Sequence, residues 1–131
     1  MLKGEPAAAQ VELLLRRHDP LISSVNLAEV IDVLIRRDGF AETEIRGLID
    51  PLLQKELKVI SVSGELAWSA SYLRARHYHR RDRPLSLADC IALATSIEFG
   101  RLATADALLA QVARDEGVDV VGLPNSEGVI P

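Results

Sequence analysis

Short apolar runs alternate along the chain with longer stretches of helical periodicity, and this alternation limits the fold more than any other feature. Residues 21–23, 58–62, 102–104 and 118–121 have the length and residue types of buried strands. Between them, apolar residues recur three and four positions apart, as on one face of a helix. Strands that alternate with helices indicate a parallel sheet covered on both faces. We therefore predict a three-layer α/β/α fold around a short-stranded parallel sheet.

The helical segments carry signals for where they begin and end. Asn26 with Glu29 three residues later, and Ser86 with Asp89, have the pattern of a capping box at a helix start. Pro51 lies inside a helical segment and predicts a bend or break there, because proline lacks the N–H that a helix interior needs. We expect helices over residues 6–18, 27–37, 41–53, 65–78, 87–99 and 106–117.

Size and composition predict one soluble domain over residues 1–131. Hydrophobic residues make up 48% of the chain and charged residues 26%, which suffices for one aliphatic core. Cys90 is the only cysteine, which excludes a disulfide and a cysteine zinc site and fits a reducing compartment. The first ten residues lack a signal-peptide pattern, and no apolar run reaches the roughly 18 residues of a membrane span. We therefore expect a cytoplasmic protein with no membrane partner.

Three acidic residues share one setting at the start of an expected helix. Glu29, Asp89 and Asp106 lie in first helical turns, and Glu29 and Asp106 closely follow expected strands. In an open parallel sheet such turns meet at the carboxyl edge, where ligands bind. Clustered carboxylates repel one another, and a hard divalent cation such as Mg²⁺ or Mn²⁺ relieves that repulsion. Each acid alone is also explained as a helix cap or as a favourable charge at a helix N-terminus.

The same acids lie in three segments that resemble the successive acid-bearing segments of PIN domains: SSVNLAEV, LSLADCIALA and LATADALL. The PIN domain is the fold of the VapC-type toxin ribonucleases, and the similarity runs from about residue 4 to residue 121. The resemblance implies a parallel sheet flanked by helices and RNA cleavage with Mg²⁺ or Mn²⁺. Carried over by position, Glu29, Asp89 and Asp106 would hold the metal. Thr104 matches a hydroxyl residue found two positions before the last acid.

The start of the chain departs from the family pattern. PIN domains normally begin with a strand, central in the sheet, that ends in an aspartate, whereas nothing here precedes Met1. We therefore expect this first, central strand and one metal ligand to be missing. Either the natural protein is longer by about a dozen residues, or the chain is a degenerate, inactive relative. The first explanation is favoured, because the other three acids remain together.

A basic stretch interrupts an otherwise acidic chain. The net charge is −4, but residues 74–83 hold five arginines and one acid and carry +4, which leaves −8 for the rest. Arginines in this place, directly before the Asp89 helix, either bind RNA phosphates or form a solvated helix end and loop. The RNA-binding candidates are Arg74, Arg76, Arg80, Arg81 and Arg83.

Three other features have a plain structural explanation beside a functional one. Trp68 is the only tryptophan, and a single tryptophan on a helix favours packing over base stacking. The apolar stripe over residues 45–53 is either part of the core or a surface for a second copy or another partner. Cys90 lies on an apolar helix and is expected to be a core residue rather than a nucleophile.

The leading functional hypothesis is a metal-dependent endoribonuclease, the toxin component of a VapBC-type toxin–antitoxin system. Asp89 and Glu29 would hold the cation, Asp106 would support a second site or a ligating water, and Thr104 would orient nearby groups. RNA is the expected substrate, a cognate antitoxin the expected partner, and a homodimer the expected assembly. The alternative is a catalytically inactive PIN-like binding module that dimerises or binds an antitoxin. A receiver-type signalling domain fits poorly, because the chain lacks its paired acids and its lysine after the last strand.

Overall fold

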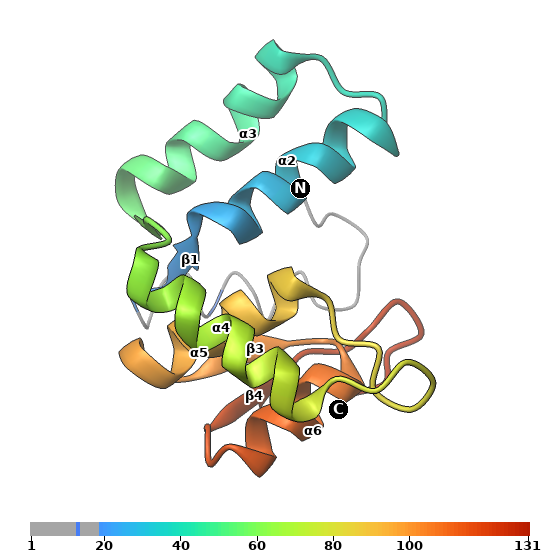
Figure 1. Cartoon of the computed structure of the whole chain (residues 1–131). Helices are drawn as coiled ribbons and strands as arrows, with labels where there is room; N and C mark the ends of the chain where they lie inside the picture. The colour runs from blue at the N-terminus through green and yellow to red at the C-terminus, as the bar shows by residue number, and fades with distance from the viewer. Residues whose placement is uncertain (1–12, 14–18) are drawn as a thin grey trace.

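Helices and short strands alternate along the described residues, as the sequence pattern predicts (Figure 1). The computed structural model describes residue 13 and residues 19–131, so the helix expected over residues 6–18 lies, apart from Leu13, outside the described part. No helix in that part is long and apolar enough to cross a membrane. The elements are β1 (Leu21–Ser23), α2 (Ser24–Arg36), α3 (Glu42–Lys55), β2 (Lys58–Ile60), α4 (Gly64–His77), α5 (Leu87–Phe99), β3 (Leu102–Thr104), α6 (Ala107–Asp115) and β4 (Val120–Gly122).

The strands are parallel and pair two by two. In one pair β1 lies beside β2 with Leu21 opposite Lys58, and in the other β3 lies beside β4 with Leu102 opposite Val120. A helix or a pair of helices crosses over between the partners of each pair, which confirms the predicted α/β class with parallel strands. We predicted a short-stranded parallel sheet that lacks its first, central strand, and the described strands form two separate sheets of two strands each.

Side chains at the strand–helix junctions explain where most helices begin. Four of the described helices start after a side-chain oxygen that accepts the backbone N–H three residues later, the usual arrangement of an N-cap. The capping residues are Ser23, Ser63, Ser86 and Asp106. The fifth helix, α3, has no such cap, but the Glu44 carboxylate accepts the backbone N–H of Ala41 at 3.1 Å.

The main core lies between α4, α5 and α6 and is aliphatic, as the composition predicts. Helix α5 supplies its centre, with Cys90 and Leu93 fully buried, which agrees with a helix that is apolar almost all round. Helix α6 contributes Val112 and Ala113. Gly100 ends α5 with φ 141°, a conformation that favours glycine over residues with a Cβ. The core therefore fixes α5, whose first turn carries Asp89.

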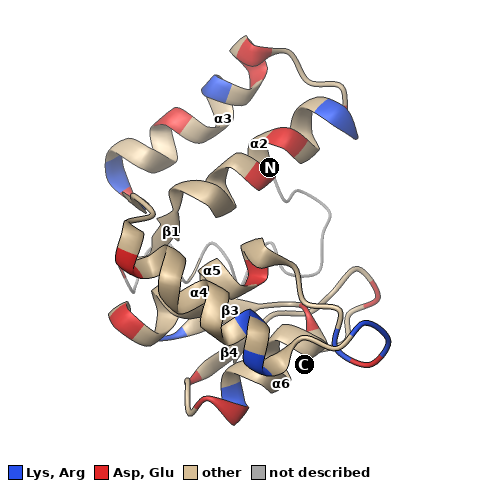
Figure 2. Cartoon of the chain, in the orientation of Figure 1, with Lys and Arg blue, Asp and Glu red and all other residues tan. Residues whose placement is uncertain are grey.

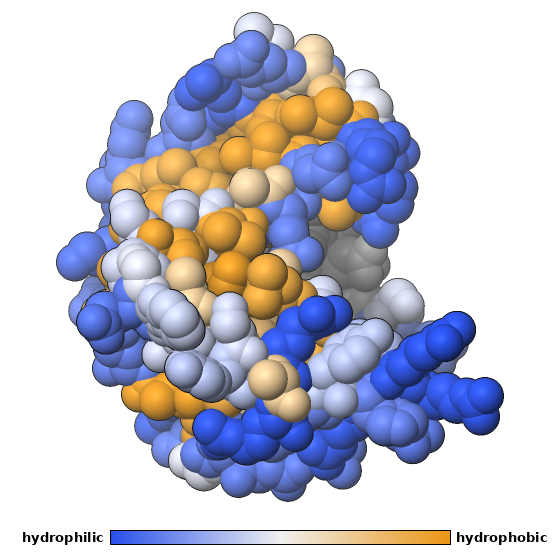
Figure 3. Space-filling model, in the orientation of Figure 1, coloured by the Kyte–Doolittle hydropathy of each residue, from blue (hydrophilic) through white to orange (hydrophobic). Residues whose placement is uncertain are grey.

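Helices α2 and α3 form an arm at the other end of the molecule (Figure 1). A second, smaller cluster joins them, in which Leu34 of α2 packs with Ile45 and Ile49 of α3. An apolar groove of about 450 Å³ runs between the two helices, and Figure 3 shows hydrophobic surface along this arm. The stripe over residues 45–53 is thus partly core and partly groove wall.

Pro51 does not break α3, contrary to the sequence-based prediction. The helix continues through Pro51 to Lys55. Proline removes the N–H that would bond the carbonyl of residue 47, but both Pro51 and Gly47 are exposed, so water can solvate that carbonyl. The helix therefore keeps Leu53 on the face that packs against α2.

Candidate functional site

Asn26 holds the starts of α2 and α5 together. Its side-chain Nδ2 donates a hydrogen bond to the backbone carbonyl of Ala88 at 3.0 Å and lies 3.4 Å from Oε1 of Glu29. Ala88 directly precedes Asp89 in the first turn of α5. Two of the three predicted acids are therefore carried on adjacent helix starts that one amide group connects.

Ser23 fixes which way this amide points. The Ser23 hydroxyl donates to Oδ1 of Asn26 at 2.5 Å, so the opposite end of the amide, Nδ2, faces Ala88 and Glu29. Ser23 is 2% exposed and its Oγ also accepts the backbone N–H of Asn26 at 3.0 Å. The predicted capping box of Asn26 and Glu29 is therefore wrong: Ser23, at the end of β1, already caps α2. The Glu29 carboxylate is left exposed and has no capping role.

Asp89 is held by its own helix start, as predicted. The Ser86 hydroxyl accepts the backbone N–H of Asp89 at 3.0 Å, and Oδ2 of Asp89 accepts the backbone N–H of Ser86 at 3.2 Å. This capping box fixes the half-buried carboxylate through one oxygen. Its second oxygen makes no hydrogen bond to the described residues. Capping and ligand binding are therefore compatible at this residue.

Cys90, next to Asp89, is a core residue, as expected. Its side chain is fully buried and carries no disulfide. Burial raises the pKa of the thiol, and the nearby carboxylate of Asp89 raises it further, while Arg74 acts in the opposite direction. A thiol that resists ionisation is a poor nucleophile. Cys90 therefore contributes packing at this site.

Asp106 and Thr104 form a third junction, between β3 and α6. Oδ1 of Asp106 accepts the backbone N–H of Leu109 at 2.8 Å, so Asp106 is the N-cap of α6. The Thr104 hydroxyl, on a residue only 9% exposed, accepts the backbone N–H of Asp106 at 3.0 Å. Thr104 thus sets the backbone from which the Asp106 carboxylate projects.

The described residues bring two of the acids near each other but do not gather all three. In this part of the chain, no three His, Cys, Asp or Glu side chains lie close enough to hold a metal ion. None of Glu29, Asp89 and Asp106 forms an ion pair with a described lysine, arginine or histidine. Their negative charge is therefore not compensated within the described part. Carboxylate oxygens are the donors that a hard divalent cation prefers, but the described residues bring at most two of these three acids near one place.

Three of the five arginines in the basic stretch fasten it to the rest of the molecule. Arg76 pairs with Glu116 at 2.5 Å, and Arg83 pairs with Asp115 at 2.9 Å. The Nε of Arg74 donates to the backbone carbonyl of Leu85 at 3.0 Å. No local pattern in the sequence indicates these pairings, since Arg76 and Glu116 lie 40 positions apart.

Arg80 and Arg81 are the two arginines that remain exposed at the tip of the loop. Neither makes an ion pair within the described residues, and Figure 2 shows the basic loop projecting from the body beyond the end of α4. The five candidates for RNA contact therefore divide into three that also have a structural role and two with none.

Trp68 is not a packing residue, so the prediction from its type is wrong. The side chain is 67% exposed and its ring stacks on Tyr72, with the ring centres 5.8 Å apart. The apolar face of α4 is formed by Leu66, Ala70 and Leu73, and position 68 lies on the opposite face of the helix.

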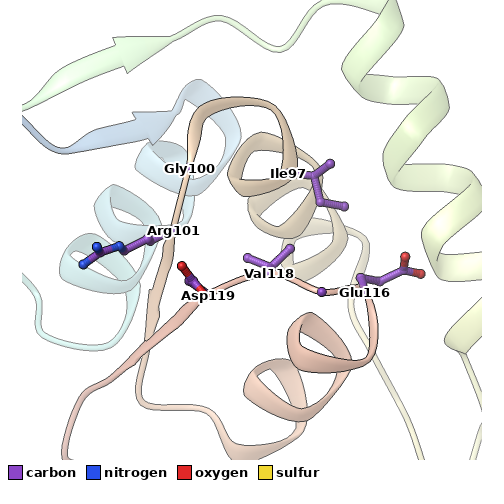
Figure 4. Close-up of a pocket in the computed structure, with 7 residues that line it drawn as sticks. Ile97, Gly100, Arg101, Glu116, Val118 and Asp119 are labelled. Atoms are coloured by element: carbon purple, nitrogen blue, oxygen red, sulfur yellow. The ribbon is translucent and has the colours of Figure 1, made fainter.

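A pocket of about 400 Å³ lies at the other end of β3 and β4 (Figure 4). Arg101 and Asp119, which directly precede these strands, are among its lining residues. Asp106 follows the carboxyl end of β3, whereas the pocket lies at the amino end. Neither this pocket nor the groove between α2 and α3 includes any of the three acids. Glu29 and Asp106 are exposed and Asp89 is half-buried.

Comparison with known proteins identifies the family. The PIN domain family model matches residues 1–115. This span runs through β1 and α5 to α6 and includes Glu29, Asp89 and Asp106. No curated protein sequence matches the chain. With its parallel strands, its helices and this match over most of its length, the chain belongs to the PIN domain family.

Proposed function

We propose that this chain is a metal-dependent endoribonuclease and the toxin component of a VapBC-type toxin–antitoxin system. PIN domains are generally nucleases. The observation that carries the proposal is the Asn26 bridge, which brings the uncompensated carboxylate of Glu29 beside the helix start that fixes Asp89. Helix caps alone do not explain this arrangement, because Ser23 already caps α2.

Mg²⁺ or Mn²⁺ would be held by Asp89 and Glu29, with Asp106 at the edge of the site. Their oxygen donors suit these ions, and PIN nucleases usually use divalent metals. When bound, such a cation polarises a phosphoryl oxygen and lowers the pKa of a water molecule, which can then attack the phosphodiester.

The chain's own residues position these groups. Ser86 holds one oxygen of Asp89 and leaves the other available. Asn26 sets the direction of Glu29, and Thr104 sets the backbone of Asp106. Arg80 and Arg81, which are exposed and make no ion pair within the described part, would bind RNA phosphates in this proposal.

The proposed partners are RNA, a cognate antitoxin and a second copy of the chain. PIN domains bind RNA and often pair with antitoxins. The groove between α2 and α3, lined by Leu27, Ile31 and Leu53 among others, suits an apolar helix. The uncompensated acids suit an arginine from the antitoxin, which would occupy the place of the metal.

Cleavage of a mixed structured RNA tests the proposal. We expect cutting with Mn²⁺ or Mg²⁺, none with EDTA, and none with Asp89→Asn, which keeps an oxygen for the Ser86 N–H. Asp32→Asn is the matched control, because Asp32 is an exposed acid of α2 that pairs only with Arg36. Full activity of Asp89→Asn would remove this assignment. Calorimetric titration of Mn²⁺ should show binding to the Asp32 variant and not to the Asp89 variant.

A catalytically inactive binding module is the second candidate. It is favoured by the finding that the described residues contain no group of three acids able to hold a metal. This candidate predicts no divalent-metal binding and no cleavage, together with a mass that rises with protein concentration or on adding an antitoxin. Metal binding that Asp89→Asn abolishes would exclude it.

A further inference from the structure

The outer face of α4 carries two exposed aromatic rings stacked on each other. Trp68 and Tyr72 are 67% and 61% exposed, their ring centres are 5.8 Å apart, and their planes differ by 29°. They lie four positions apart and therefore on one face of the helix. The stacking organises two large rings on the surface without burying them in the described molecule.

Cationic side chains continue this face toward the end of the helix and into the loop. Arg76 follows Tyr72 by one turn, and Arg80 and Arg81 follow at the loop tip. The guanidinium group of Arg74 lies over the Tyr78 ring at 4.4 Å from its centre. Trp68 and Arg76 are separated by about 12 Å along the helix axis, from the rise of 1.5 Å per residue. Trp68, Tyr72 and Arg76 therefore follow one another along the outer face of α4, and Arg80 and Arg81 lie in the loop beyond its end.

The charge of these residues indicates which kind of ligand this surface would bind. From Leu66 to Arg83 the chain has five arginines and a single acid, Asp82; Arg76 and Arg83 pair with Glu116 and Asp115, while Arg74, Arg80 and Arg81 make no ion pair with the described residues. A second copy seated symmetrically on this face would bring two sets of arginines together, and like charges oppose that contact. A ligand that offers both flat rings and negative charge satisfies both parts of the surface. Single-stranded nucleic acid has this composition.

We propose that Trp68 and Tyr72 are a base-stacking platform which, with Arg76, Arg80 and Arg81, binds a single-stranded segment of RNA outside the acidic site. The choice of RNA rests on the proposed nuclease function. The platform itself rests on the exposed stacked rings and the neighbouring cations.

The loop after α4 connects this platform with the acidic site. It runs from His77 to Ser86, which caps the helix that begins with the Asp89 turn. Arg74 ties Leu85 to α4, and the backbones of His79 and Arg83 exchange two hydrogen bonds of 2.9 Å. This loop therefore has a defined course (Figure 2). RNA that stacks on α4 and follows the arginines is led toward the first turn of α5.

Trp68 is the only tryptophan, so its fluorescence reports on the platform directly. The probe is a single-stranded 2′-O-methyl RNA oligonucleotide of mixed sequence, which resists cleavage, titrated in EDTA into the full chain. We expect saturable quenching of Trp68 emission. An oligomer of the same charge with abasic sites should bind more weakly and quench little, because it has no bases to stack.

Variants distinguish the contribution of base stacking to RNA affinity from the contribution of the arginine charges. With a dye-labelled oligonucleotide, Trp68→Ala and Tyr72→Ala should each weaken binding about tenfold without changing its salt dependence. Arg80→Ala and Arg81→Ala should each reduce the slope of log K against log salt by about 0.7. Phe40→Ala is the control, because Phe40 is another exposed aromatic residue, in the connection between α2 and α3, and should bind as the parent does.

The outcomes keep the platform distinct from the nuclease proposal. If the arginine variants lose affinity while Trp68→Ala and Tyr72→Ala bind normally, the platform is refuted and RNA binding by the proposed nuclease stands. If the parent chain binds no RNA, both fail. If Trp68 emission changes with protein concentration alone while the mass doubles, a second copy covers the rings and the platform is refuted. Loss of cleavage in Asp89→Asn affects none of these readouts.

Discussion

Asn26 reaches across 62 positions of sequence to donate a hydrogen bond to the backbone carbonyl of Ala88. This bond connects the helix that carries Glu29 directly with the helix that carries Asp89, and Val25 of α2 also packs against the core to which α5 belongs. No other side chain of similar shape can replace Asn26. The Ala88 carbonyl needs a hydrogen-bond donor, and the Ser23 hydroxyl needs an acceptor. The amide group of asparagine supplies both.

Asn26→Asp should therefore destabilise the site, although the two side chains have nearly the same size. The aspartate keeps the acceptor for Ser23 but places a negative oxygen against the Ala88 carbonyl and beside Glu29. We expect a free energy of unfolding lower by about 1–3 kcal/mol and a shift in metal affinity, both measurable by urea denaturation and Mn²⁺ titration. Asn26→Ala should lose less stability. The reverse order of the two variants would contradict the role assigned to Nδ2.

Comparing Ser86→Ala with Asp89→Asn separates the capping of α5 from the proposed metal binding by Asp89. The hydroxyl that accepts the Asp89 N–H is lost, and we expect a decrease of about 1 kcal/mol in stability. Asp89→Asn keeps an oxygen for the Ser86 N–H and should change stability less while removing metal binding. Thermal unfolding of both variants checks this. A larger stability loss in Asp89→Asn than in Ser86→Ala would mean that the carboxylate is chiefly structural.

Cys90 should make stability depend on pH in the alkaline range. The folded state raises the pKa of its thiol above the ordinary value of 9.0, so the thiol stays protonated in the folded state while the unfolded state ionises. Its contribution is fully present below that ordinary value and is lost as pH rises through the folded pKa. Urea denaturation between pH 7 and pH 10 should show a steeper decline for the parent than for Cys90→Ala. Equal slopes would contradict the raised pKa.

Glu116→Gln tests the attachment of the basic stretch to α6. Glu116 accepts from both Arg76 and His77, and its side chain is only 16% exposed. We expect a loss of about 1 kcal/mol in stability, together with tighter RNA binding at low salt, because one acid near the arginines is removed. Glu98→Gln is the control, an exposed acid without an ion pair in the described residues. Unchanged stability and affinity would show that the pair is incidental.

Apolar periodicity was enough to predict most of the fold. The strands at Leu21–Ser23 and Leu102–Thr104 and the central place of α5 follow from local patterns, and the structure confirms them. The pairing of strands two by two was not predictable, because three-residue strands leave partner choice to the packing of whole helices.

The residues of the site stay a prediction, and their contacts were harder to predict than their positions at helix starts. The sequence predicted Asn26 as the cap of α2, but Ser23 caps this helix and the Asn26 amide bonds instead to Ala88, a contact between distant segments. The exposure of Trp68 was missed for a similar reason: the residue type favours burial, while the helix turns that position outward. The ion pairs of Arg76 and Arg83 likewise join residues far apart in sequence.

The separate small core of the α2–α3 arm has a consequence for local unfolding. Only Leu34, Ile45 and Ile49 form its buried centre, so α3 should open more often than α5 and exchange its amide hydrogens sooner. Asn26 lies in the first turn of α2, and neither Asn26 nor Ala88 belongs to the α2–α3 cluster, so such opening should leave the bond between them in place. A binding partner on the arm would slow exchange in α3 first, so the arm and the α4–α6 core should respond to ligands on different timescales.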